Sequence, residues 1–202
     1  MKDLCSYLFK VKAAGLKPMA GRVLVAEPFI DRTCFNHGVL SLIDYNPEDG
    51  ATGVVLNNRT EYMLAELIEG ITADTPIPVY CGGPTGQDRI YFVHTLGPDI
   101  IPDARPYADG LYVGGSFDAA ADYVNGGYPT DGYIRFFIGY TNWVEGQLEK
   151  ELASSVWATL PQALAPSQLL SDSGDRAWHN AVRALGGDFR PWRLIPRNPV
   201  CN

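Results

Sequence analysis

The segment GYIRFFIGY, residues 132–140, limits the possible folds more than any other part of the chain. In an extended strand, successive side chains point to opposite faces, so Ile134, Phe136 and Ile138 share one face. The other face is also largely apolar, because it carries Phe137 and a second aromatic ring. A strand that is apolar on both faces is typical of the centre of a covered sheet. We therefore expect a sheet with other elements packed on both of its sides.

The remaining apolar runs are shorter and predict strands and helices in mixed order. Residues 46–50, Asn-Pro-Glu-Asp-Gly, lie between two β-branched runs and indicate a hairpin. Ser116 precedes a helical pattern and can accept a hydrogen bond from an amide of its first turn. We expect strands within residues 21–29, 38–45, 51–58, 77–81, 89–95 and 110–115, and helices within residues 61–70, 116–127, 144–157 and 174–187. Because no regular strand–helix–strand repeat connects them, we expect a mixed α+β fold rather than a doubly wound sheet.

The first twenty residues are expected to differ from the rest of the chain. Leu4, Leu8 and Val11 have helical spacing, and lysines surround them. A membrane-surface helix is one reading, but three apolar residues bury too little area for stable anchoring. A short helix docked on the domain or on a second subunit is the favoured reading. We expect an N-terminal helix or extension over residues 1–20 and a single domain over residues 21–202.

The balance of charge limits the classes of partner. The chain has 16 Lys and Arg against 23 Asp and Glu, a formal net charge of −7, which opposes binding to nucleic acid phosphates. No apolar run approaches the ~20 residues of a membrane span, and the first residues lack a secretory signal pattern. We therefore expect a cytoplasmic protein that contacts neither membrane nor DNA directly. The cysteines are widely spaced and indicate reduced thiols rather than a disulfide framework: Cys5, Cys34, Cys81 and Cys201.

The stretch VYCGGPTGQDRIYFVHT, residues 79–95, contains the side chains most suited to a catalytic or binding role. Cys81 could act as a nucleophile with His94 as its base, if their two strands are adjacent. The amides of Gly82 and Gly83 could then stabilise an oxyanion. The structural reading is a small buried cysteine at the end of a strand, followed by a tight glycine turn, and it is the favoured one.

Phosphate and metal sites are not indicated. The glycine pairs match neither phosphate-binding glycine motif, and the lone histidines His37, His94 and His179 lie in three different segments, so no cofactor or metal is expected. Asp88 and Arg89 are adjacent and predict a bidentate ion pair that fixes the turn. Acidic residues around Lys150 predict a solvated helix face: Glu145, Glu149 and Glu151.

Four motifs make the chain similar to a known family. They are PVYCGGPTGQDRIYFVHT, IGYTNWVEGQLEKELASSVW, VAEPFIDRTCFNHGVLSLI and DGATGVVLNN. With these the chain resembles the YqgE/AlgH family of bacterial proteins, over nearly everything from Gly21 to about Gly187. The resemblance implies a bent, partly barrel-like β-sheet surrounded by helices. It also implies a regulatory role, since members are widely described as transcriptional regulators.

The residues of the family motif can be matched to particular positions of this chain. Most of them are glycines, prolines and aromatic residues, which suit a role in shaping the fold: Pro28, Phe35, Gly53, Gly82, Gly83, Pro84, Gly139, Tyr140, Trp143, Gly146, Leu148 and Trp157. The polar members are Asn57, Asp88, Arg89, His94, Gln147, Glu149 and Glu151. The candidate binding or interaction residues are Asn57, Gly82, Gly83, Asp88, Arg89, His94, Gln147 and Glu149. The chain departs from the family at Cys81, Tyr45 and Asn58, where an aliphatic residue, a histidine and a lysine are usual.

Two functional hypotheses follow from the sequence. The first is a non-enzymatic regulatory or interaction protein that acts through protein partners rather than through direct DNA contact. The second is a small-molecule or anion-binding protein, or a hydrolase, with a site near the glycine turn, Arg89 and His94. The sequence also leaves open the association of several copies of the chain.

Overall fold

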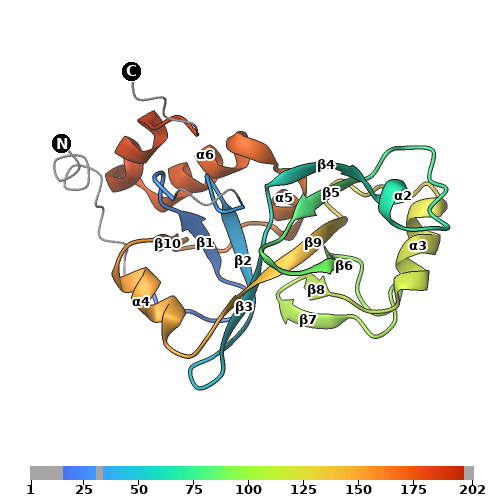
Figure 1. Ribbon diagram of the computed structural model, residues 1–202, viewed down its shortest axis with the longest axis horizontal. Helices are drawn as coiled ribbons and strands as arrows, with labels where there is room; N and C mark the ends of the chain where they lie inside the picture. Colours follow the sequence, from blue (N-terminus) through green and yellow to red (C-terminus); the bar gives the residue numbers. More distant parts are fainter. Residues whose placement is uncertain (1–15, 31–33, 198–202) are drawn as a thin grey trace.

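The computed structural model describes residues 16–30 and 34–197, so the helix expected over residues 4–11 lies outside the described residues (Figure 1). The strands are β1 Val23–Ala26, β2 Val39–Asn46, β3 Gly50–Val55, β4 Arg59–Met63, β5 Pro78–Cys81, β6 Thr85–His94, β7 Arg105–Ala108, β8 Leu111–Val113, β9 Ile134–Trp143 and β10 Trp157–Thr159. The helices are α2 Leu64–Leu67, α3 Phe117–Asn125, α4 Gln147–Ala153, α5 Pro166–Ser171, α6 Gly174–Leu185 and the 3-10 helix η1 Gly187–Leu194. The mixed α+β class expected from the sequence is confirmed.

The strands form one bent sheet in the order β10-β1-β2-β3-β9-β6-β8-β7, with β5 also paired to β9 and β4 paired to β5. All pairs are antiparallel except β5 with β9. The sheet is open. Its β7 end approaches β2 only through side chains, as where the hydroxyls of Ser41 and Tyr107 lie 3.3 Å apart. The expected hairpin is formed by β2 and β3.

Strand β9 is central, as its two apolar faces predict. Strand β6 pairs along one edge of β9. The other edge is shared, because β5 pairs with residues 136–138 and β3 with residues 141–143. In Figure 1 the long β9 arrow runs from the β5–β6 side of the molecule to the β3 side.

Helices cover both faces of the sheet. In β1, Val23 and Val25 pack in one core cluster with Trp178 of α6, while Leu24 and Ala26 pack in another with Leu148 of α4. A third cluster places α3 over the ends of β5, β6 and β9. Among the described residues no helix is both long and apolar enough to cross a bilayer.

One charged side chain lies inside the protein and holds α5 in place. Arg135 of β9 is only 4% exposed. Its Nη1 donates to the carbonyl oxygens of Leu56 at 2.7 Å and Asp172 at 2.9 Å, and its Nη2 donates to that of Leu170. Arg135 shares a largely apolar face of β9 with Phe137, and backbone carbonyls after β3 and at the end of α5 satisfy it rather than a carboxylate.

Two expected helices are shorter than predicted. In residues 61–70 the chain continues as β4 to Met63, and only Leu64–Leu67 are helical. In residues 144–157 the helix ends at Ala153, and Ser155 takes a left-handed φ of 58°. The backbone turns there because Trp157 pairs with Ala26 in the sheet. Pairing with a strand distant in sequence thus overrides the local helical pattern.

Candidate functional site

A cleft of about 430 Å³ lies beside the turn that follows β5. Its walls come from the segment after β1, the turn after β5, the end of β9, helix α4 and the start of β10. The lining residues are Glu27, Ile30, Phe35, Pro84, Thr141, Asn142, Trp143, Gln147, Glu151, Val156 and Trp157. Segments that are far apart in the sequence therefore build one concave surface.

Glu151 organises the polar side of this cleft. Its Oε2 accepts hydrogen bonds from the indole Nε1 atoms of Trp143 and Trp157, each at 2.8 Å. Its Oε1 accepts one from Gln147 Nε2 at 3.0 Å. Both indole rings are buried, so the carboxylate satisfies donors that have little access to water. The expectation that Glu151 belongs to a solvated helix face is wrong, because two buried tryptophans, one on β9 and one on β10, donate to its carboxylate.

The cleft carries negative charge on an aromatic wall. Glu27 and Glu151 are its ionisable lining residues, and no lysine or arginine is among the described residues that line it. Phe35 and Trp157 meet edge to face, with ring centroids 5.5 Å apart. Such a surface suits a cationic group on an apolar stem.

The Gly82-Gly83 turn has a packing role. The Gly82 amide donates to the carbonyl of Ile138 at 2.9 Å, so it is not available to an oxyanion. A Cβ on Gly82 would lie 2.3 Å from the carbonyl oxygen of Gly139. The turn is thus pressed against β9, and only glycine permits that approach.

Cys81 and His94 are not neighbours, because β9 lies between β5 and β6. Cys81 aligns with Ile138 of β9, whereas His94 aligns with Ile134. The expected cysteine–histidine pair is therefore wrong. A hydrogen bond from the Cys34 thiol lowers the pKa of Cys81 to about 6, and burial opposes this shift.

His94 is buried within the protein. Its Nε2 lies 3.1 Å from the carbonyl oxygen of Gly114, and its ring stacks near Tyr112. Its Nδ1 has no hydrogen-bond partner among the described residues. Burial lowers the pKa of His94, with the Gly114 contact opposing the shift.

Asp88 and Arg89 form a weaker pair than expected. Arg89 Nε and Asp88 Oδ2 are 3.8 Å apart, and the two side chains are 76% and 77% exposed. The contact is single rather than bidentate, and an exposed pair of this kind contributes little to stability. Arg89 lines a separate, shallower hollow with Leu67 and Phe117, far along β6 from His94.

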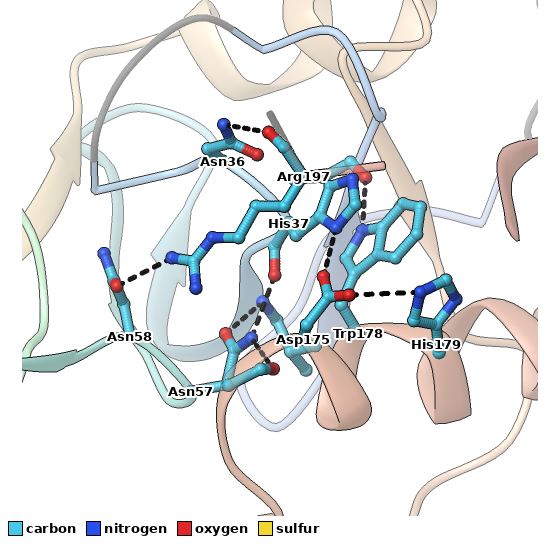
Figure 2. A network of polar contacts seen from close by, with 11 residues as sticks. Asn36, His37, Asn57, Asn58, Asp175, Trp178, His179 and Arg197 are labelled. Carbon is cyan, nitrogen blue, oxygen red and sulfur yellow. Dashed lines mark hydrogen bonds and ion pairs between the residues drawn. The ribbon is translucent and has the colours of Figure 1, made fainter. Parts of the chain in front are cut away.

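Asn57 and His37 belong to a polar network at the start of α6 (Figure 2). Asn57 accepts a bond from the Val39 amide at 2.8 Å and donates to the carbonyl oxygens of His37 at 2.9 Å and Gly174 at 2.8 Å. It thereby fastens the start of α6 to the hairpin. Its role in the structure is to join backbone segments.

Two of the three histidines meet in this network, which their separation in sequence did not indicate. His37 Nδ1 contacts Asp175 Oδ1, and His179 Nε2 lies 3.2 Å from Asp175 Oδ2. The His37 ring stacks on Trp178 with centroids 3.7 Å apart. Burial lowers the pKa of His37, and Asp175 opposes the shift. No group of three potential ligands suited to a metal ion occurs in the described part of the chain.

Gln147 and Glu149 point to different surroundings although both belong to α4. Gln147 lines the cleft, and its Oε1 accepts a bond from the Val144 amide at 3.2 Å. Glu149 accepts a bond from the hydroxyl of Tyr45 at 2.6 Å, and this bond raises the pKa of Tyr45. Of the candidate residues, only Gln147 is among the described residues that line the cleft, and the turn after β5 contributes Pro84.

Comparison with known proteins assigns the chain to a family. The family model described as AlgH-like matches residues 23–190. The chain belongs to the AlgH-like family. A UPF0301 protein of Parabacteroides distasonis is 36% identical over 195 residues, covering 96% of this chain and 97% of the relative. Another from Bacteroides thetaiotaomicron is 33% identical over 200 residues, covering 99% and 100%.

Solved structures agree with this assignment. The solution structure of the AlgH protein from Pseudomonas aeruginosa is 26% identical and superposes with a TM-score of 0.66, over 85% of this chain and 92% of that one. A crystal structure of a Corynebacterium diphtheriae protein, 22% identical, shares the fold with a TM-score of 0.65, over 89% and 92%.

Some of the AlgH-like motif residues identified in the sequence line the cleft. Those that line it are Phe35, Pro84, Trp143, Gln147, Glu151 and Trp157. They come from three of the four motifs, so the cleft is where the family pattern converges in space. Glu151 was not among the candidate residues drawn from the sequence, although one motif places a tryptophan on either side of it.

Proposed function

We propose that this AlgH-like protein is a non-enzymatic interaction protein with a regulatory role, and that its cleft receives a lysine or arginine side chain of a partner protein. The observation that carries this proposal is the pairing of two carboxylates, Glu27 and Glu151, with the aromatic wall of one cleft. A basic side chain offers both parts of the match, since its stem is apolar and its head is charged.

Glu151 is well placed to receive such a head group. Its Oε2 is occupied by two indole donors, whereas its Oε1 accepts only the Gln147 bond among the described residues. A carboxylate oxygen can accept two hydrogen bonds, so Oε1 retains acceptor capacity towards the cleft. The indole bonds fix the carboxylate in position, which reduces the entropy lost when a ligand binds.

The charge of the whole chain favours the same class of partner. A net charge of −7 attracts basic protein surfaces and repels duplex DNA. A cytoplasmic regulator that acts on transcription through a protein partner is consistent with this charge. A hydrolase or anion site at the glycine turn is not proposed, because Arg89 and His94 point into different surroundings.

The proposal is tested by titrating the full chain with the peptides Ac-Ala-Arg-Ala-amide and Ac-Ala-Lys-Ala-amide, followed by tryptophan fluorescence. The neutral peptide Ac-Ala-Nle-Ala-amide is the control ligand. We expect Glu151→Gln to weaken binding of the basic peptides about tenfold through loss of a partly buried charge. Glu149→Gln is the matched control on the same helix, and we expect it to leave binding unchanged.

Equal binding of the neutral and basic peptides, or equal effects of the two substitutions, would contradict the proposed occupant of the cleft. A parallel titration with duplex DNA at physiological salt tests the choice of partner class. We expect no binding there. Submicromolar, salt-sensitive binding to the duplex would instead show that the protein contacts DNA itself.

A further inference from the structure

We propose that Cys34 and Cys81 form a modification site, in which a small-molecule disulfide converts the two thiols to an internal disulfide and thiols reverse the reaction. The two cysteines are 47 positions apart in the sequence, since 81 − 34 = 47, and both are partly buried. Nothing in their spacing indicates a pair. The fold brings them together.

Asn58 holds both cysteine backbones. The Cys81 amide donates to the carbonyl oxygen of Asn58 at 2.8 Å, and Asn58 Nδ2 donates to the carbonyl oxygen of Cys34 at 3.3 Å. Arg197 Nη2 in turn donates to Asn58 Oδ1 at 3.0 Å, which fixes the amide plane (Figure 2). One anchored side chain thus sets the distance between the two segments.

The side chains of the two cysteines are also close to each other. The Cys34 thiol is hydrogen-bonded to the sulfur of Cys81. A disulfide requires that the two Cβ atoms lie close and that the sulfurs can reach bonding distance. The contact places the two sulfurs near each other, and we expect rotation about the Cα–Cβ bonds to bring them to bonding distance.

The assignment of roles follows from the same contact. The hydrogen bond from Cys34 stabilises the thiolate of Cys81 and lowers its pKa. The thiolate is the attacking form in disulfide exchange. We assign the attack to Cys81 and the resolving step to Cys34, and the single-serine variants test that order.

The chemistry balances with glutathione disulfide as the oxidant. The Cys81 thiolate attacks one sulfur of glutathione disulfide, so a mixed disulfide forms and one glutathione thiolate leaves. Cys34, after losing its proton to solvent, attacks the Cys81 sulfur and displaces the second glutathione thiolate. Two protein thiols are oxidised to one disulfide, and one glutathione disulfide is reduced to two glutathione molecules.

The disulfide would join two walls of the cleft. Cys34 directly precedes Phe35, and Cys81 lies three residues before Pro84, and both Phe35 and Pro84 line the cleft. A bond between the two segments fixes their separation. This consequence rests on the proposed function, because it predicts that oxidation changes the affinity for the basic peptides.

The test uses the full chain carrying Cys5→Ser and Cys201→Ser, so that only the proposed pair remains. After treatment with glutathione disulfide we expect the intact mass to fall by two hydrogen atoms, and a digest to contain a peptide that links positions 34 and 81. Adding Cys34→Ser should leave a stable glutathione adduct on Cys81. Adding Cys81→Ser should slow the reaction about tenfold or more, because the activated thiolate is lost.

A persistent glutathione adduct while both cysteines are present, a disulfide between two chains, or no reaction at all would overturn the proposal. Peptide binding is measured separately on the reduced and oxidised forms. If the internal disulfide forms but the reduced protein binds no basic peptide, the thiol pair stands and the proposed function fails. If the reduced protein binds and oxidation leaves its affinity unchanged, the link between the pair and the cleft is wrong.

Discussion

The guanidinium of Arg135 lies over the ring of Tyr80, 4.2 Å from the ring centroid. The same group donates to the backbone carbonyls of Leu56, Leu170 and Asp172, so one side chain satisfies three acceptors. We expect Arg135→Met to lower the free energy of unfolding by about 3 kcal/mol or more, since the carbonyls lose their donors. Urea denaturation measures the change. Arg135→Lys should lose less, and a loss under about 0.5 kcal/mol for the methionine variant would contradict this role.

Replacing Glu151 should destabilise the cleft from within. In Glu151→Leu the indole N–H groups of Trp143 and Trp157 lose their shared acceptor, which we expect to cost about 2–4 kcal/mol. Glu149→Leu removes only the contact with Tyr45 and should cost less than about 1 kcal/mol. Urea denaturation with near-UV circular dichroism follows both stability and the tryptophan environment. Similar losses in the two variants would show that the indole bonds add nothing.

The glycine turn offers a steric prediction with a matched control. A Cβ on Gly82 would lie 2.3 Å from a backbone oxygen, whereas a Cβ on Gly187 would have no heavy atom within 4 Å. We expect Gly82→Ala to cost about 2 kcal/mol or more through forced displacement of the turn, and Gly187→Ala to be neutral or slightly stabilising. Thermal unfolding distinguishes the two. A Gly82→Ala protein as stable as the wild type would contradict the tight approach to β9.

Buried His94 predicts a loss of stability in acid. Its folded-state pKa is lowered from the ordinary value of 6.5, so below that pH the unfolded chain takes up a proton that the folded chain does not. Stability is therefore complete above pH 6.5 and falls as pH decreases from there towards the folded-state pKa. Protonation would also place an N–H on Nδ1, which has no acceptor among the described residues.

The measurement is the midpoint of thermal unfolding between pH 7.5 and pH 5, compared with His94→Gln. The substitution should flatten part of the pH dependence, and the slope that remains is expected from His37, whose pKa is lowered in the same direction. If the thermal midpoint depended on pH equally in the wild type and in His94→Gln, protonation of His94 would not destabilise the folded protein.

The central position of β9 could be predicted because it depends on local information. Alternating apolar residues on both faces of one segment require cover on both sides, whatever the order of the strands. The separation of Cys81 from His94 could not be predicted in this way. It depends on β9 entering between β5 and β6, and β9 is formed some 40 residues later in the chain.

The contrast between Glu149 and Glu151 shows the same limit of sequence-based prediction within one helix. Both are acidic residues on α4, and helical periodicity alone gives neither a special role. Their surroundings differ because Trp143 comes from β9 and Trp157 from β10, and together they place two donors beside Glu151. The approach of Cys34 to Cys81 likewise depends on Asn58, which lies in the connection between β3 and β4.

The sharing of one edge of β9 by β3 and β5 determines how this protein can be divided. A fragment that ends before residue 134 would leave three strands without one of the partners to which they hydrogen-bond: β3, β5 and β6. Truncated pieces should therefore not behave as autonomous folding units on either side of that boundary. A tag, a cleavage site or the new termini of a circular permutation should be placed in a peripheral loop instead, where cutting the chain separates no paired strands.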